Sequence, residues 1–378
     1  MTRAIDEALL DDGEALAGAD RGGTLLALAG AGAQVRTALT LAVEAGAASV
    51  AQDGRPRAVV VAALGGSAVV ADLLTALAGP GSPVPVTAVH SSTLPGWVSP
   101  LDLVVAVSMS GRAVGPLAVA SEAARRGCRL LTVGREQSPL AEVCARARGV
   151  HVPVRGGLRS SRAALWSLAV PVLVAADALG LVHSDAAVLT ATADALDAVA
   201  DAARPSSESF VNPAKSLAID LAGTVPLVLG AGDLAGVAAL RTAAQLSRNA
   251  RHPAVAGILP DAAAEVVATF DGPFVRSDAD LFADPFDAAP ATTLRLLLLR
   301  DVADDEDEDV RRVANVVADT AREGGVLVTQ LRAAPGPALA RIASLVGLTD
   351  FASVYLALGL GLDPATSPHV ADLKERMR

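Results

Sequence analysis

The sequence predicts an α/β protein with two tandem domains, each a parallel sheet flanked by helices in the doubly wound, flavodoxin-like manner. Three observations lead to this fold class. Wholly apolar runs such as Val59–Leu64 and Leu103–Val107 are typical of strands buried on both faces. Segments of helical length separate these runs, and strands that alternate with helices pair in parallel. The alternation occurs twice, on either side of a polar break at Arg204–Glu208.

The order of these patterns divides the chain into four segments. Residues 1–54 are expected to be an N-terminal helical segment, 55–203 the first domain, 204–348 the second domain, and 349–378 a C-terminal helix and tail.

The first domain contains five apolar runs that predict strands, and the residues between them have helical periodicity. Gly127 is placed to end the helix that runs to Arg126. The expected strands are Val59–Leu64, Val84–His90, Leu103–Val107, Arg129–Val133 and His151–Val154. The expected helices include Ala68–Leu77, Ala141–Ala147, Ser161–Leu179 and Asp185–Ala203.

The second domain repeats this order of elements. The acidic run Asp301–Asp309 is expected to be a solvated loop, because its carboxylates are consecutive and not turned inward around a metal ion. A polar tail is expected to close the chain. The strands expected here are Val225–Leu229, Val255–Ile258, Thr293–Leu299 and Gly325–Gln330, and the helices are Leu234–Arg248, Val310–Glu323 and Ala338–Gly361.

The composition excludes several classes of function. A net charge of −10 argues against nucleic acid or an anionic membrane surface as the main partner. Cys128 and Cys144 have no metal-binding or redox spacing. No metal and no cofactor is expected. The acidic, amphipathic first residues are unlike a signal peptide, which favours a cytoplasmic protein with reduced thiols. The chain has only two lysines among its 31 basic residues, Lys215 and Lys374.

Two turns of the first domain combine serine with glycine at the point where a strand ends and a helix begins. They are Gly65-Gly66-Ser67 and Ser108-Met109-Ser110-Gly111. Ligands of open parallel sheets bind beyond the carboxyl ends of the strands, and hydroxyls with helix-start amides suit a phosphate monoester. A dinucleotide is not favoured, because neither turn contains the GxGxxG pattern, and the Gly-Lys-Ser/Thr phosphate loop is also absent.

This succession of turns resembles the sugar isomerase (SIS) domain, which binds phosphosugars through such serines. From about residue 55 to its end, the chain resembles the two-domain bifunctional phosphoglucose/phosphomannose isomerase family. The resemblance extends over both domains through LGGSAVVADLL, LPGWVSPLDLVVAVSMSG, Ser161–Leu165, VNPAKSLA and DFASVYLALGLGLDP.

The resemblance implies an aldose–ketose isomerisation of hexose 6-phosphates, in which a proton moves between C1 and C2 through an enediolate. It implies glucose 6-phosphate, fructose 6-phosphate or mannose 6-phosphate as the ligand, and a homodimer. Arg162 matches the arginine near the enediolate, and Lys374 matches a lysine close to the C-terminus. The residues implied to bind the phosphosugar are Gly65, Gly66, Ser67, Ser108, Ser110, Gly111 and Arg112.

The chain departs from this family at three positions. Ala113 stands where the phosphate loop of the family has its last hydroxyl residue, so one hydrogen-bond donor is missing. The positive charge of Arg112 is a candidate to replace the contribution of that donor. Arg248 stands where the family has its base glutamate, and an arginine cannot accept a proton. Alanines replace the ring-opening histidine, and Glu265 matches a glutamate of the same stretch.

Three functions remain open on this basis. The first is an active isomerase in which His252 or Glu265 takes the role of the base. The second is a catalytically silent phosphosugar-binding sensor or regulatory subunit, which keeps the phosphate turns and lacks the base. The third is a subunit that only lends its surface to a complex.

Overall fold

The computed structural model describes residues 4–155, 157, 160–275 and 292–376. The chain forms two compact units, and each is described by itself. We call the unit made of segments 30–195 and 336–340 the N-unit, and the unit made of 1–29, 196–335 and 341–378 the C-unit. The four segments expected from the sequence stay a prediction.

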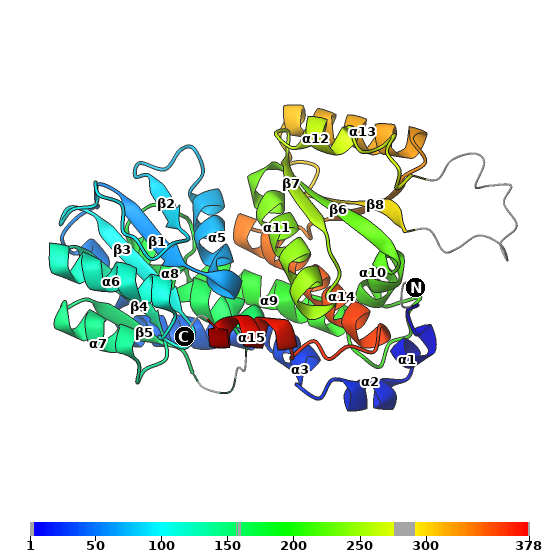
Figure 1. The fold of residues 1–378 in the computed structure, drawn as a ribbon. Helices are drawn as coiled ribbons and strands as arrows, with labels where there is room; N and C mark the ends of the chain where they lie inside the picture. The colour runs from blue at the N-terminus through cyan, green and yellow to red at the C-terminus, as the bar shows by residue number, and fades with distance from the viewer. Residues whose placement is uncertain (1–3, 156, 158–159, 276–291, 377–378) are drawn as a thin grey trace, which may run out of the picture. The chain divides into compact units, whose positions relative to one another are not determined.

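The N-unit contains a five-stranded parallel sheet in the order β2-β1-β3-β4-β5 (Figure 1). This is the flavodoxin-like order, in which the direction of strand addition reverses between β1 and β3. All five strands lie where the apolar runs predicted them. Their bounds are β1 Val59–Ala63, β2 Val86–Val89, β3 Leu103–Ser108, β4 Arg129–Gly134 and β5 Val150–Pro153.

Helices cover both faces of this sheet. On one face α6 and α7 pack against β1, β3 and β4, where small side chains such as Val60 and Ala106 contact Val119 of α6. On the other face lie α5 and α8 (Figure 1), and α4 packs on α8. The helical elements of this unit, with α9 continuing into the C-unit, are α4 Ala31–Glu44, η1 Ala47–Ala51, η2 Gly65–Ser67, α5 Val69–Ala78, α6 Val114–Arg126, α7 Pro139–Arg146, η3 Ser161–Ala163, α8 Leu165–Ala178 and α9 Ala186–Ala202.

The C-unit contains a four-stranded parallel sheet in the order β7-β6-β8-β9. This order equals that of the first sheet without its fifth strand, so the predicted α/β fold with two similar parallel sheets is confirmed. Leucines of β6 and β8 pack on α13 across one face, and α11 covers the other. The strands are β6 Thr224–Ala231, β7 Val255–Leu259, β8 Thr293–Arg300 and β9 Leu327–Arg332.

Several helices of the C-unit differ from the sequence expectations. Helices α10 and α12 were not predicted, and residues 368–376 form α15 where a polar tail was expected. All three are helices of nine residues or fewer, and so short a stretch gives periodicity little to detect. The helices are α1 Glu7–Asp11, α2 Gly13–Ala19, α3 Thr24–Ala29, α10 Pro213–Leu221, α11 Gly232–Asn249, α12 Ala263–Val267, α13 Glu308–Glu323, α14 Ala338–Gly359 and α15 Pro368–Arg376.

Helix α14 is the one helix in the described part of the chain that is long and apolar enough to cross a membrane, and 94% of its apolar window is buried. Gly347 leaves room for Val199, and Gly359 leaves room for Ile5. Burial as a core helix therefore accounts for its composition.

Lys215 ties three parts of the C-unit together. Its ammonium group is fully buried and donates to the carbonyl oxygens of Leu10 at 2.5 Å, Pro205 at 2.8 Å and Ser207 at 2.6 Å. It also lies 5.5 Å from the ring centroid of Tyr355. An ammonium has three donors, and all three are used here. Desolvation lowers the pKa of Lys215.

We expect Lys215→Met to lower the free energy of unfolding by about 3 kcal/mol or more, because three buried carbonyl groups lose their donor. Urea denaturation measures the change. Arg146→Met, at an exposed position of α7, is the control and is expected to stay within about 0.5 kcal/mol of the wild type. Equal midpoints for the two variants would show that Lys215 is not needed to hold these segments.

Candidate functional site

The turn after β1 is built for close contact with a second turn. Gly65 has a φ of +61°, which lets the chain leave the strand and enter η2 and α5. A Cβ on Gly66 would lie 2.6 Å from Oγ of Ser161, so only glycine allows η2 to approach η3 this closely. Ser67 is buried, and its hydroxyl has no hydrogen-bond partner among the described residues.

Arg162 lies directly over this first turn. Its Cγ would be 3.5 Å from a Cβ on Gly66, and only 8% of the residue is exposed. The hydroxyl of Ser160 accepts hydrogen bonds from the backbone amide of Arg162 at 3.2 Å and from its Nε at 3.1 Å. Gln34 of α4 donates to the carbonyl oxygen of Ala163 at 2.8 Å and holds η3 from the other side.

The turn after β3 presents two serine hydroxyls. Oγ of Ser108 accepts the amide of Ala113, and Oγ of Ser110 accepts the amide of Arg112, both at 3.3 Å. Because each hydroxyl accepts from the backbone, its own hydrogen remains available to donate to a ligand. The Arg112 side chain is exposed and makes no ion pair to any residue that the structure describes.

Gly111 joins this second turn to the loop after β4. Its φ is +65°, and a Cβ there would overlap the side chain of Ser138. Its carbonyl oxygen accepts the amide of Leu140 at 3.2 Å. The turn is therefore locked against the start of α7.

The two serine turns lie next to each other. Strands β1 and β3 are paired in parallel with Ala63 opposite Val107, so both turns begin at the same carboxyl edge, one strand spacing apart. The helices α5 and α6 begin there too and direct the positive ends of their dipoles to this edge. Seven of the candidate residues therefore meet at one place, and Arg162 joins them.

The corresponding edge of the C-unit contains acidic residues in place of the serines. Asp233 follows the turn after β6, and Asp301 follows β8. Glu306 of the acidic run is buried and pairs with Arg300 at 2.7 Å, and Asp301 pairs with Arg341 at 2.7 Å. Part of the run expected to be solvated is thus buried in ion pairs. In the described residues no cluster of three or more potential metal ligands occurs.

The other candidate catalytic residues belong to the C-unit. His252 lies between α11 and β7, at the amino edge of the sheet. Desolvation lowers the pKa of its imidazole, and hydrogen bonds with the backbone of Thr224 and Leu221 offset part of this effect. Glu265 lies in α12, beyond the carboxyl edge of β7. The two are therefore at opposite edges of one sheet, and one small ligand of this unit cannot reach both. Lys374 lies in α15.

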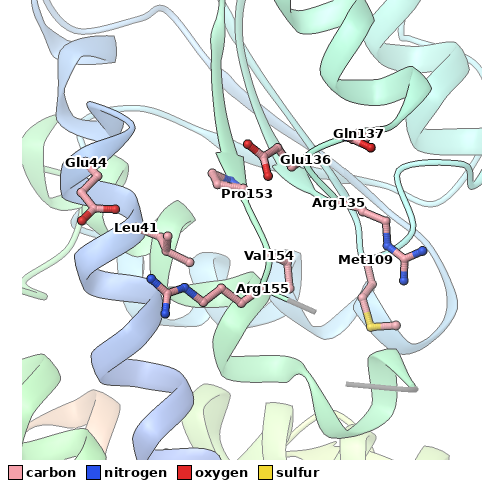
Figure 2. A pocket seen from close by; sticks show the side chains of 9 residues that line it. All are labelled: Leu41, Glu44, Met109, Arg135, Glu136, Gln137, Pro153, Val154 and Arg155. Carbon is pink, nitrogen blue, oxygen red and sulfur yellow. The ribbon is translucent and has the colours of Figure 1, made fainter. Parts of the chain in front are cut away.

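A cavity that the sequence analysis missed lies at the carboxyl edge of the N-unit. Its volume is about 580 Å³, and Met109, Arg135, Glu136, Gln137, Arg155 and Glu44 contribute to its wall (Figure 2). Met109 stands between the two serines of the second turn. The signal was present in the sequence, because a charged segment follows β4 directly at the edge where ligands bind.

Comparison with known proteins supports the fold and the resemblance. Residues 210–377 match the family described as the bacterial phospho-glucose isomerase C-terminal SIS domain. The C-terminal part of the chain therefore matches an SIS domain, and the chain as a whole resembles the bifunctional phosphoglucose/phosphomannose isomerases. The enzyme of that name from Caldicellulosiruptor bescii is 24% identical over 319 residues, which are 84% of this chain and 89% of the relative.

Two solved structures share the fold of this chain. A hypothetical protein from Thermus thermophilus matches with a TM-score of 0.66 and 16% identity, over 98% of this chain and 96% of that one. A candidate phosphosugar isomerase from Silicibacter pomeroyi matches with a TM-score of 0.64 and 21% identity, over 90% of this chain and 99% of that one.

The contact between Gly111 and Ser138 yields a test of this architecture. We expect Gly111→Ala to destabilise the protein by about 2–4 kcal/mol, from left-handed backbone strain plus overlap with Ser138. Gly65→Ala has a similar φ with open space around the Cβ, and is expected to cost only about 1–2 kcal/mol.

Ser138→Gly in the Gly111→Ala background removes the side chain that the new Cβ overlaps. Ser138 is the N-cap residue of α7, and glycine is tolerated at that position. It is expected to recover part of the stability, as measured by urea denaturation in a double-mutant cycle. Additive effects of the two changes would show that the turns are not locked together.

Proposed function

We propose that the N-unit binds the phosphate group of a hexose phosphate at its two serine turns. The observation that carries this proposal is the placement of Ser67 and Ser108 at adjacent strand ends, with Arg162 over the first turn. Ser67 lies at the start of α5, and Oγ of Ser108 accepts the amide of Ala113, the N-cap residue of α6. Hydroxyls, amides and a guanidinium are the donors that phosphate monoesters take up. The C-unit edge has Asp233 and Asp301 in place of the serines, and ionised carboxylates cannot donate hydrogen bonds to a phosphate.

The resemblance extends the proposal to a reaction. The relative named above is a bifunctional phosphoglucose/phosphomannose isomerase. We therefore propose that this protein interconverts fructose 6-phosphate with glucose 6-phosphate or mannose 6-phosphate by proton transfer between C1 and C2. Arg162 and Lys374 are proposed to take part, together with either Glu265 or His252 as the base. A homodimer in the cytoplasm is part of the same proposal.

One observation favours a second candidate function. By the resemblance, Arg248 stands at the position of the family's base, and a guanidinium holds its proton at any physiological pH. A protein that binds phosphosugars without turning them over, as a sensor or regulatory subunit, would keep the serine turns and tolerate this change.

Binding is tested with glucose 6-phosphate in a thermal-shift titration. We expect the wild type to be stabilised by about 2.7 kcal/mol at a ligand concentration one hundred times the Kd. The double variant Ser67→Ala/Ser108→Ala is expected to lose this stabilisation, whereas Ser121→Ala on the outer face of α6 is expected to keep it. An unchanged response of the double variant would place the phosphate elsewhere.

Turnover separates the two functions. Fructose 6-phosphate in D₂O acquires deuterium at the carbon next to the carbonyl if an enediolate forms, and NMR detects this exchange even when net conversion is slow. Exchange is expected at a rate reduced by a factor of about 10²–10⁴ relative to an enzyme with an intact base. Saturable binding without any exchange would identify the silent phosphosugar-binding protein.

A further inference from the structure

The cavity beside the second serine turn is rigidly connected to the proposed phosphate site. Met109 belongs both to the turn and to the cavity wall. The next wall segment, Arg135–Gln137, precedes Ser138, whose hydroxyl donates to the carbonyl oxygen of Arg135 at 2.7 Å and whose side chain contacts Gly111. The amide of Val154 donates to the carbonyl oxygen of Gly134 at 2.8 Å and fixes the third wall segment.

The charged groups of the cavity are available to a ligand. Arg135 and Arg155 are exposed, and neither guanidinium forms a hydrogen bond or ion pair with another residue that the structure describes. Figure 2 shows Arg155 extending toward α4 and Arg135 next to Met109. The carboxylates of Glu44 and Glu136 likewise form no ion pair within the described part of the chain.

The balance of these charges indicates which chemistry fits. Two arginines face two glutamates, so the wall carries no net charge. A second phosphate or carboxylate would gain from the arginines but lose to the glutamates. Vicinal hydroxyl groups suit such a wall, because each hydroxyl both donates to a carboxylate and accepts from a guanidinium. The volume of about 580 Å³ is within the range of small-molecule sites.

We propose that this cavity binds the uncharged, hydroxyl-rich part of a phosphosugar larger than a hexose monophosphate, such as a disaccharide phosphate. The inference rests on the proposed function, because the serine turns would anchor the phosphate end. Arg135 and Arg155 would then be specificity residues that contact the second sugar ring and leave the phosphate contacts untouched.

Isothermal titration calorimetry with glucose 6-phosphate and trehalose 6-phosphate tests the inference. The wild type is expected to bind trehalose 6-phosphate about tenfold more tightly, since hydrogen bonds to charged groups are worth about this much in affinity. Arg135→Ala and Arg155→Ala are each expected to weaken trehalose 6-phosphate at least threefold and to leave glucose 6-phosphate unchanged. Arg146→Ala, an exposed arginine at the other end of α7, is the matched control.

The possible failures are distinguishable. If neither compound binds, or if Ser67→Ala/Ser108→Ala binds both as the wild type does, the proposed function itself is overturned. If glucose 6-phosphate binds through the serines but trehalose 6-phosphate is no tighter, only the inference fails. It also fails if fructose 1,6-bisphosphate binds most tightly and loses its advantage in Arg135→Ala, because the cavity would then hold a second anion.

Discussion

The parallel pairing of β1 with β3 is the constraint on which the rest of the site depends. It brings the turns that follow β1 and β3 to one edge of the sheet, and glycines then allow the loops there to pack closely against one another. The missing side chain leaves space for η3 at Gly66, for Ser138 at Gly111, and for the carbonyl oxygen of Ser108 at Gly134. The loops after four different strands thus form one layer in which a side chain at any of these glycines would displace a neighbour.

Strand order alone does not distinguish the proposed phosphate site of the N-unit from the corresponding edge of the C-unit. They share an order of strands, and each places a switch point between its first and third strand in sequence. At the N-unit edge the turns contain small hydroxyl residues. At the C-unit edge the same places contain Asp233 and Asp301, and the buried pair of Arg300 with Glu306 fills the layer. The topology fixes where a ligand can bind, and the turn residues decide whether an anion is accepted.

The sequence was sufficient for the sheets because their strands are buried on both faces and read as uninterrupted apolar runs. It was less informative where burial is partial. Helix α10 was not predicted, although its Lys215 was noted as one of two lysines. A buried ammonium group with three carbonyl partners depends on segments far apart in sequence, which no local pattern contains. The buried part of the acidic run was missed for the same reason, since its partner Arg341 lies 40 residues beyond Asp301.

For the candidate site, parallel-sheet geometry predicts from the sequence that the two serine turns lie side by side. The rule holds equally for the strands that the sequence analysis did not connect with a ligand. The same rule places Arg135 and Arg155, which follow β4 and β5, at the same edge as the serines. It also separates His252 from Glu265, since a residue before β7 and a residue after it lie at opposite ends of that strand.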